Sequence, residues 1–169
     1  MQIERQITIE ATPDKVWEVL GPRFDQVDAW ASSVDRSTAR AGHSQIPGAP
    51  MVGRTCETEI GPVKEAILEY DEARRVVAYS AQAEKMPFFV KDMRNRWALA
   101  SGQGGRTHVD MRMTAKLSFP FNLFMTPMMK LQMGKLLTNA IEELKFFVEN
   151  GEPHPRKQKA ARAALKAAA

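Results

Sequence analysis

Residues 126–149 read TPMMKLQMGKLLTNAIEELKFFVE, and this stretch decides the fold. Its apolar residues recur with the 3.6-residue period of an α-helix and predict one stripe: Met129, Met133, Leu136, Leu137, Ala140, Ile141, Leu144, Phe147 and Val148. The polar residues fall elsewhere: Lys130, Gln132, Lys135, Asn139, Glu142, Glu143 and Lys145. Thr126 suits an N-cap, and Pro127 suits the first turn, because its missing N–H would have no partner there. Asn150 and Gly151 supply a C-terminal stop. We therefore expect a long amphipathic helix over residues 127–149.

The sequence before this helix alternates between apolar and polar residues, which is typical of half-buried strands. The expected strands cover residues 2–10, 34–41, 54–60, 63–70, 75–82, 88–101 and 106–119. Two short helices should follow the first strand, one beginning after Thr12 and the other covering residues 24–30. This order predicts an α+β fold in which a curved antiparallel sheet of about six to seven strands wraps around one long helix.

Composition and charge predict a single domain over residues 1–152, followed by a basic tail over residues 153–169. The chain has 169 residues, of which 44% are hydrophobic and 26% charged, as in ordinary globular proteins. The net charge is +4, but the tail holds five basic residues and no acid, so residues 1–152 carry a net −1. A nearly neutral body gives no sign of a nucleic-acid partner.

The chain carries few signals for export or for metal binding. Its single cysteine, Cys56, fits a reducing cytoplasm, and no secretory signal pattern follows Met1. The most apolar stretch, residues 117–129, is too short and too interrupted to span a bilayer. Three scattered histidines offer no metal-ligand spacing, so we expect neither a metal nor another cofactor: His43, His108 and His154.

The segment ITIEATPDKVWEVL, residues 7–20, together with the order of elements, resembles the helix-grip proteins of the START-like (SRPBCC) superfamily. The branch is the polyketide cyclase/dehydrase and lipid-transport type. The resemblance covers about residues 1–149 and rests on Thr12, Pro13, Val16, Trp17, Trp30, Gly53, Arg54, Gly61, Glu65, Asp71 and Tyr79. It implies a deep apolar cavity between the sheet and the C-terminal helix, but no single activity.

Inward strand residues and the helix stripe should form the walls of that cavity. The candidate ligand-binding residues are Trp30, Ile67, Tyr79, Phe89, Asn95, Trp97, Leu99, Met111, Met113, Met133 and Leu137. The alternative for any one of them is a filled core, whereas the set as a whole favours a cavity. Loops at residues 44–53 and 84–89 are candidate gates or ordinary surface loops.

Arg54 and Glu65 are the candidate polar anchors. With a two-residue turn at residues 61–62, Glu69 would lie opposite Arg54, and Glu65 would share a face with Arg54 without pairing directly. The favoured interpretation is then a partly exposed ion pair of Arg54 with Glu69, worth at most ~1 kcal/mol. The alternative is a charged anchor for a ligand carboxylate or enol.

The sequence favours a non-catalytic binding or carrier domain for a hydrophobic small molecule, lipid or polyketide-like. One alternative is a cyclase or aromatase whose Tyr79, Glu65 or Arg54 moves protons, and another is an interaction module. Residues 119–125 are apolar enough for transient membrane-surface contact, although packing against the sheet edge is favoured. The basic tail could attract anionic lipid, but we expect weak docking and a frayed, solvated end.

Overall fold

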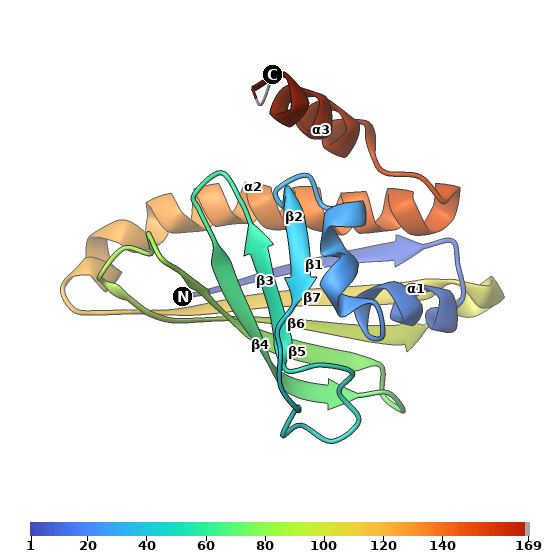
Figure 1. Cartoon of the computed structure of the whole chain (residues 1–169). Helices are drawn as coiled ribbons and strands as arrows, with labels where there is room; N and C mark the ends of the chain where they lie inside the picture. Colours follow the sequence, from blue (N-terminus) through green and yellow to red (C-terminus); the bar gives the residue numbers. More distant parts are fainter. Residues whose placement is uncertain (168–169) are drawn as a thin grey trace.

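The structure of the protein, a computed structural model, describes residues 1–167 and shows a seven-stranded sheet with one long helix lying across it (Figure 1). The elements in chain order are β1 (Gln2–Ile9), α1 (Pro13–Leu20), η1 (Phe24–Ala29), β2 (Arg36–Ala39), β3 (Gly53–Glu57), β4 (Val63–Asp71), β5 (Val76–Ala83), β6 (Val90–Ser101), η2 (Gln103–Gly105), β7 (Thr107–Leu117), α2 (Phe121–Asn150) and α3 (Pro155–Ala167). The η elements are 3₁₀ helices.

The sheet is antiparallel throughout, in the order β1-β7-β6-β5-β4-β3-β2. Its end strands are therefore the first two of the sequence, and α1 and η1 connect them across one end of the molecule (Figure 1). Helix α2 packs on β1 and β7. The predicted α+β helix-grip fold is confirmed, including the two short helices after the first strand.

Local sequence chemistry explains α1. The Thr12 hydroxyl accepts a hydrogen bond from the Lys15 N–H at 3.5 Å, and proline follows as the first helical residue. The apolar face of the helix is buried and consists of Val16, Trp17 and Leu20. These side chains close one end of the interior.

The predicted start of the long helix is wrong by six residues. Helix α2 begins at Phe121, so Pro127 lies inside it, and the Thr126 hydroxyl donates to the Asn122 carbonyl instead of capping. Pro127 is the seventh residue of α2 and lacks the N–H that would bond to the Leu123 carbonyl, yet the six residues before it are helical. The predicted stop is confirmed: Gly151 adopts the left-handed conformation, and its N–H donates to the Phe147 carbonyl at 2.8 Å.

The β3–β4 hairpin has a longer connection than the sequence suggested. The last paired residues are Cys56 and Val63, and Thr58 forms a turn with Gly61 through hydrogen bonds in both directions. Relative to a two-residue turn, the register moves by four residues. Arg54 therefore lies directly opposite Glu65, and the expected pairing of Arg54 with Glu69 is wrong.

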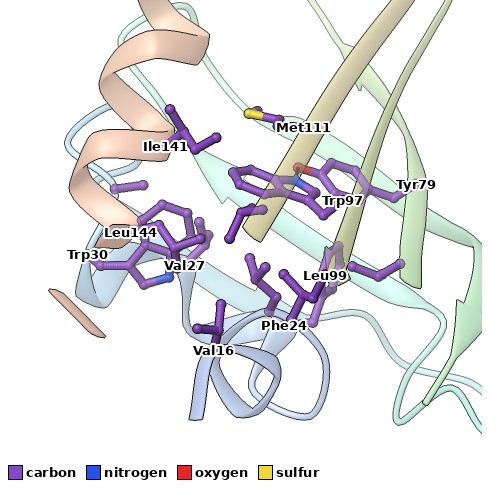
Figure 2. Packing of buried hydrophobic residues seen from close by; sticks show 14 of the residues in the cluster. Val16, Phe24, Val27, Trp30, Tyr79, Trp97, Leu99, Met111, Ile141 and Leu144 are labelled. Atoms are coloured by element: carbon purple, nitrogen blue, oxygen red, sulfur yellow. Dashed lines mark hydrogen bonds between the residues drawn. The ribbon is translucent and has the colours of Figure 1, made fainter. Parts of the chain in front are cut away.

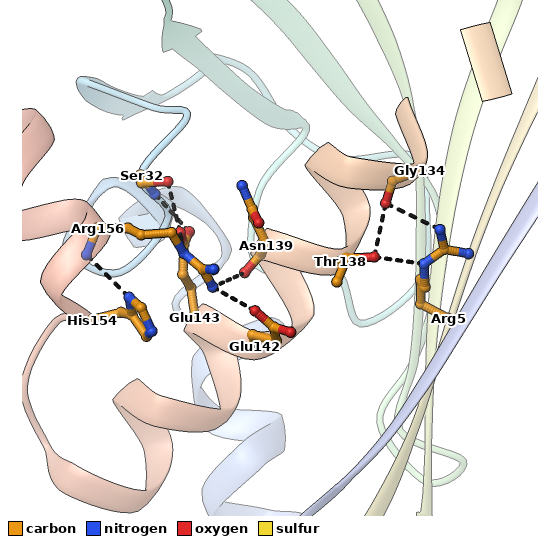
Figure 3. Close-up of polar contacts among 9 residues, drawn as sticks. All are labelled: Arg5, Ser32, Gly134, Thr138, Asn139, Glu142, Glu143, His154 and Arg156. Carbon is orange, nitrogen blue, oxygen red and sulfur yellow. Dashed lines mark hydrogen bonds and ion pairs between the residues drawn. The ribbon is translucent and has the colours of Figure 1, made fainter. Parts of the chain in front are cut away.

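The start of the tail is ordered and packed on the body, contrary to the expected frayed end. Arg156 forms ion pairs with Glu142 at 2.8 Å and Glu143 at 3.0 Å (Figure 3). The Lys157 ammonium, buried with its side chain, donates to the Val34 carbonyl at 2.6 Å. Polar contacts supply the docking that the weak apolar stripe of α3 could not.

Glu143 is the residue whose environment differs most from its expected polar face. Its side chain is 1% exposed, and it accepts hydrogen bonds from the backbone N–H and the hydroxyl of Ser32 as well as from Arg156 (Figure 3). A buried carboxylate needs such partners. Glu143 thus joins α2, α3 and the segment after η1.

Candidate functional site

A cavity of about 430 Å³ lies between the sheet, α2 and η1. Most of its wall is apolar, which is typical of pockets for small hydrophobic ligands. Of the predicted ligand-binding residues, eight lie on this wall: Trp30, Tyr79, Asn95, Trp97, Met111, Met113, Met133 and Leu137. Both predicted polar anchors, Arg54 and Glu65, also lie on it.

Three predicted residues do not line the cavity. Ile67 and Leu99 are buried, and they belong to the filled part of the core instead. Figure 2 shows Leu99 packed near Val16 and Phe24, so the short helices fill the space that it faces. Phe89 precedes β6 and stacks on Phe121 with ring centroids 5.1 Å apart. Alternation predicts which side chains of a strand point inward. It does not predict which of them pack against the short helices and which line the cavity.

Sequence reasoning missed several wall residues. Phe24 and Val27 come from η1, whose irregular turns carry no clear period. Met93 had a usable signal, because it precedes Asn95 and Trp97 on the same face of β6. The two loops considered as gates, residues 44–53 and 84–89, contribute no wall residue among residues 1–167.

The outer part of the cavity lies between the β3–β4 loop and the middle of α2. Ile60 of the loop and Leu136 of the helix both line the cavity and are 59% and 40% exposed. Gln132 and Met133, one turn before Leu136, line the same region. This rim gives the cavity access to solvent.

Arg54 and Glu65 form a buried ion pair at the centre of the polar wall. The Arg54 Nε lies 2.5 Å from a Glu65 carboxylate oxygen, and its Nη1 donates to the Phe24 carbonyl. The Arg54 guanidinium carbon also lies 4.0 Å from the centroid of the Phe24 ring. Burial, the largest single effect, opposes the charge on Arg54. Glu65, Tyr79 and Cys56 together favour the charge and raise the arginine pKa on balance, so the guanidinium stays cationic.

Tyr79 lies beside this pair on β5. The Trp97 indole N–H donates to its hydroxyl oxygen at 3.3 Å, and Figure 2 shows the two rings side by side. Burial first, and then the charge of Glu65, raises the pKa of Tyr79. The phenol is therefore neutral at physiological pH and can donate a hydrogen bond to a guest.

Cys56 completes the polar part of the wall from β3. Burial first, and then the charge of Glu65, raises the pKa of its thiol to about 11. The thiol is therefore protonated at neutral pH and is a poor nucleophile.

The polar wall keeps unused hydrogen-bonding capacity. Within residues 1–167, neither Arg54 Nη2 nor the Tyr79 hydroxyl hydrogen has a protein partner, and the Asn95 amide makes no hydrogen bond. These donors gather in an otherwise apolar space. The arrangement can hold one acceptor group of a ligand whose remainder is apolar. Among the same residues, no three His, Cys, Asp or Glu side chains group closely enough to hold a metal ion.

A curved antiparallel sheet that encloses an apolar cavity against one long helix defines a START-like, helix-grip protein. The chain belongs to the polyketide cyclase/dehydrase and lipid transport family, because the model of that family matches residues 1–149. None of the helices among residues 1–167 has the length and apolar character needed to cross a bilayer.

Solved structures support the fold at low sequence identity. A START superfamily protein from Mycobacterium smegmatis is 14% identical, with a TM-score of 0.69 over 88% of this chain and 97% of that one. Protein XoxI from Bacillus cereus is 17% identical, with a TM-score of 0.69 over 90% and 99%. A truncated norcoclaurine synthase from Thalictrum flavum is 12% identical, with a TM-score of 0.66 over 89% and 94%. No curated protein sequence matches the chain.

Proposed function

We propose that the protein binds a hydrophobic small molecule, lipid or polyketide-like, in the cavity under α2 and carries it without transforming it. The observation that carries this proposal is an apolar cavity of about 430 Å³ with one cluster of unused donors. Residues 1–152 would form the binding unit. The family description, which includes lipid transport, supports the same class of ligand.

The polar wall favours a ligand with a single hydrogen-bond acceptor at one end. Arg54 Nη2 and the Tyr79 hydroxyl would donate to a carbonyl, hydroxyl or carboxylate oxygen, while the methionines and Trp97 surround the apolar part. Glu65 neutralises Arg54, so the site does not demand an anionic ligand. Methionine side chains adapt to guests of different shape.

The cavity residues favour binding over catalysis. A general base needs a free acceptor with a pKa near neutrality, but Glu65 is ion-paired with Arg54 and Tyr79 holds its proton. The competing function is that of a cyclase in which the cavity folds the substrate and Tyr79 donates a proton to an enolate oxygen. The position of the Tyr79 hydroxyl on the cavity wall is the observation that favours it.

Native mass spectrometry of the freshly purified protein tests the binding proposal. We expect an added mass that denaturation releases and that extracts into organic solvent. Ala140→Trp, which fills the cavity from α2, should abolish the added mass and the binding of an apolar fluorophore. Leu165→Trp on the exposed part of α3 is the matched control and should change neither. An added mass on the Ala140→Trp variant equal to that on the wild type would show that the ligand does not bind in the cavity.

Tyr79→Phe separates the carrier from the enzyme. A carrier retains most of its affinity, because Arg54 and Asn95 still face the ligand. An enzyme that uses the phenol loses turnover by roughly 10²–10⁴-fold while its ligand affinity stays similar. The comparison requires incubation of both forms with the extracted ligand, followed by mass analysis for a changed product.

A further inference from the structure

The first half of α2 carries large apolar side chains that face solvent. We define this apolar end by six residues: Phe88, Phe119, Leu123, Phe124, Met128 and Leu131. Each is 45–78% exposed. Single exposed apolar residues are common on protein surfaces, but a cluster of this kind indicates a binding surface. We propose that the apolar end docks on the surface of an anionic phospholipid bilayer.

The spacing places three of these side chains on one stripe of α2. Phe124, Met128 and Leu131 follow one another at i, i+4 and i+7, so they lie along one stripe of the helix. The stripe is separate from the buried one, which holds Leu137 and Ile141. Helix α2 thus presents a second apolar stripe, which the rest of residues 1–167 leaves uncovered.

The β5–β6 connection extends this face beyond the helix. The Phe88 ring packs edge-on against the Phe121 ring, with centroids 5.1 Å apart, and is itself 72% exposed. Phe121 belongs to the first turn of α2. Two segments that are distant in the sequence therefore contribute to one end of the molecule, where Figure 1 shows the loop beside the start of α2.

The charges around this end fit anionic headgroups. From Met111 to Ile141 the sequence contains no acid, whereas Lys116, Lys130 and Lys135 lie within that range. None of these lysines forms a salt bridge within residues 1–167. Lys135 follows Leu131 at i+4 and lies beside the apolar stripe, as lysines do in helices that lie in the headgroup region, where each contributes roughly fivefold in affinity.

The same charges argue against a second copy of the chain as the occupant. A twofold contact through the apolar end would bring each set of lysines close to its copy, and lysine is depleted in protein interfaces. The tail does not supply the attraction that the sequence suggested, because Arg156 is ion-paired and α3 lies above the other half of α2 (Figure 1). The basic residues of α2 itself carry the charge.

The apolar end adjoins the open rim of the cavity. Leu131 is followed directly by Gln132 and Met133, which line the cavity beside Ile60. Docking would therefore bring the cavity rim close to the lipid surface. The docking proposal does not depend on the cavity ligand, although exchange of a ligand with the bilayer would rest on the proposed carrier function.

Co-sedimentation with vesicles tests the docking. We expect the protein to pellet with phosphatidylcholine vesicles that contain roughly a quarter phosphatidylglycerol, and at least about tenfold less with pure phosphatidylcholine. The double variant Leu123→Ser/Phe124→Ser should lose at least about tenfold in binding, since it removes two large apolar anchors. Leu165→Ser, at a site 73% exposed on α3, is the apolar control and should bind normally.

Charge variants test the contribution of the lysines, and the molar mass in solution tests for self-association. Lys130→Gln/Lys135→Gln should weaken binding by roughly tenfold and flatten its salt dependence, while Lys159→Gln on α3 should not. Equal pelleting of the Leu123→Ser/Phe124→Ser variant and the wild type would overturn the proposal. Absence of vesicle binding, with self-association that this double variant abolishes, would also overturn it in favour of a second copy. Normal docking by Ala140→Trp would support docking even if the cavity proposal fails.

Discussion

Arg54 and Glu65 illustrate how a buried charge depends on one partner. Both side chains are at most 11% exposed, and the guanidinium also donates to the Phe24 carbonyl. Removal of one member of a buried pair leaves the other charge desolvated and unpaired, which costs far more than loss of an exposed pair. The polar wall of the cavity therefore depends on Glu65 for stability as well as for geometry.

Glu65→Ala should lower the free energy of unfolding by about 3 kcal/mol, because Arg54 then stays buried without its partner. Urea unfolding monitored by tryptophan fluorescence measures the change. Glu69→Ala is the matched control. Its carboxylate pairs with Arg74 and Arg96 at side-chain exposures of 37–68%, so the loss should stay below about 1 kcal/mol. The reverse order of effects would support the register expected from the sequence and contradict the structure.

The Cys56 thiol gives the folding stability a dependence on alkaline pH. Burial raises its pKa from 9.0 to about 11, so above pH 9 the unfolded chain releases a proton that the folded chain keeps. Stability is therefore complete below pH 9 and falls as the pH rises through 11, by about 3 kcal/mol in total. Tyr79, whose pKa burial also raises, contributes with the same sign above pH 10.

Cys56→Ala should remove this alkaline loss of about 3 kcal/mol, as measured by urea unfolding across the same pH range. The variant and the wild type should differ by a constant amount below pH 9, where the thiol is protonated in both states. Parallel pH curves over the whole range would show that the folded thiol ionises as easily as the unfolded one.

At the level of elements, the β3–β4 hairpin shows a strand register that could not be predicted from the sequence alone. Gly61-Pro62 is a strong turn signal, and a two-residue turn is the simplest hairpin, yet the turn formed by Thr58 and Gly61 lengthens the connection. A shift of four residues is even, so every side chain keeps its predicted face. Faces were therefore predictable, whereas partners across the hairpin were not.

Gly53→Ala should destabilise the protein by more than about 2 kcal/mol. A Cβ at this position would lie 2.0 Å from the Glu65 carbonyl oxygen, so β3 and β4 could no longer approach. Gly134→Ala is the control, because its Cβ would meet only the flexible end of Arg5 and alanine favours the helix by about 1 kcal/mol. Thermal unfolding followed by circular dichroism compares the two. A Gly53→Ala protein as stable as the wild type would refute this close approach.

Helix α2 was predictable over its second half and less so over its first. Leu137, Ile141 and Leu144 follow the expected buried stripe. The first turns lack this periodic burial, and Thr126-Pro127 imitates a helix start so well that local chemistry gives the wrong boundary. Glu143 was misplaced for another reason, since its partners Ser32 and Arg156 are distant in the sequence.

For the whole molecule, the sequence predicted a cavity and most of its wall. Ten of the thirteen candidate residues line it, because strand alternation and family resemblance both concern which face points inward. The three exceptions, Ile67, Phe89 and Leu99, depend on where neighbouring elements fill the interior. The position along a strand at which a helix packs depends on tertiary structure, and the periodicity of the sequence does not predict it.

Arg156→Ala should weaken ligand binding several-fold although it lies outside the cavity. Its loss frees α3 from Glu142 and Glu143 and leaves the buried Glu143 carboxylate without its cation. Arg162→Ala, exposed later on α3, is the control and should bind ligand normally. Titration with an apolar fluorophore, together with hydrogen exchange over residues 30–36, measures both effects. Unchanged hydrogen exchange in residues 30–36 would show that the α3 contacts do not stabilise this part of the cavity wall.

The contacts of α3 help to hold one wall of the cavity in place. Ser33 and Val34 line the cavity. Glu143 of α2 accepts hydrogen bonds from Ser32, and Lys157 of α3 donates to the Val34 carbonyl. The segment of residues 32–34 therefore lies between the cavity and the C-terminal part of the chain. A chain that ends at residue 152 would keep every residue that lines the cavity, but it would lose Lys157, which holds the Val34 carbonyl, and Arg156, the cation paired with Glu143.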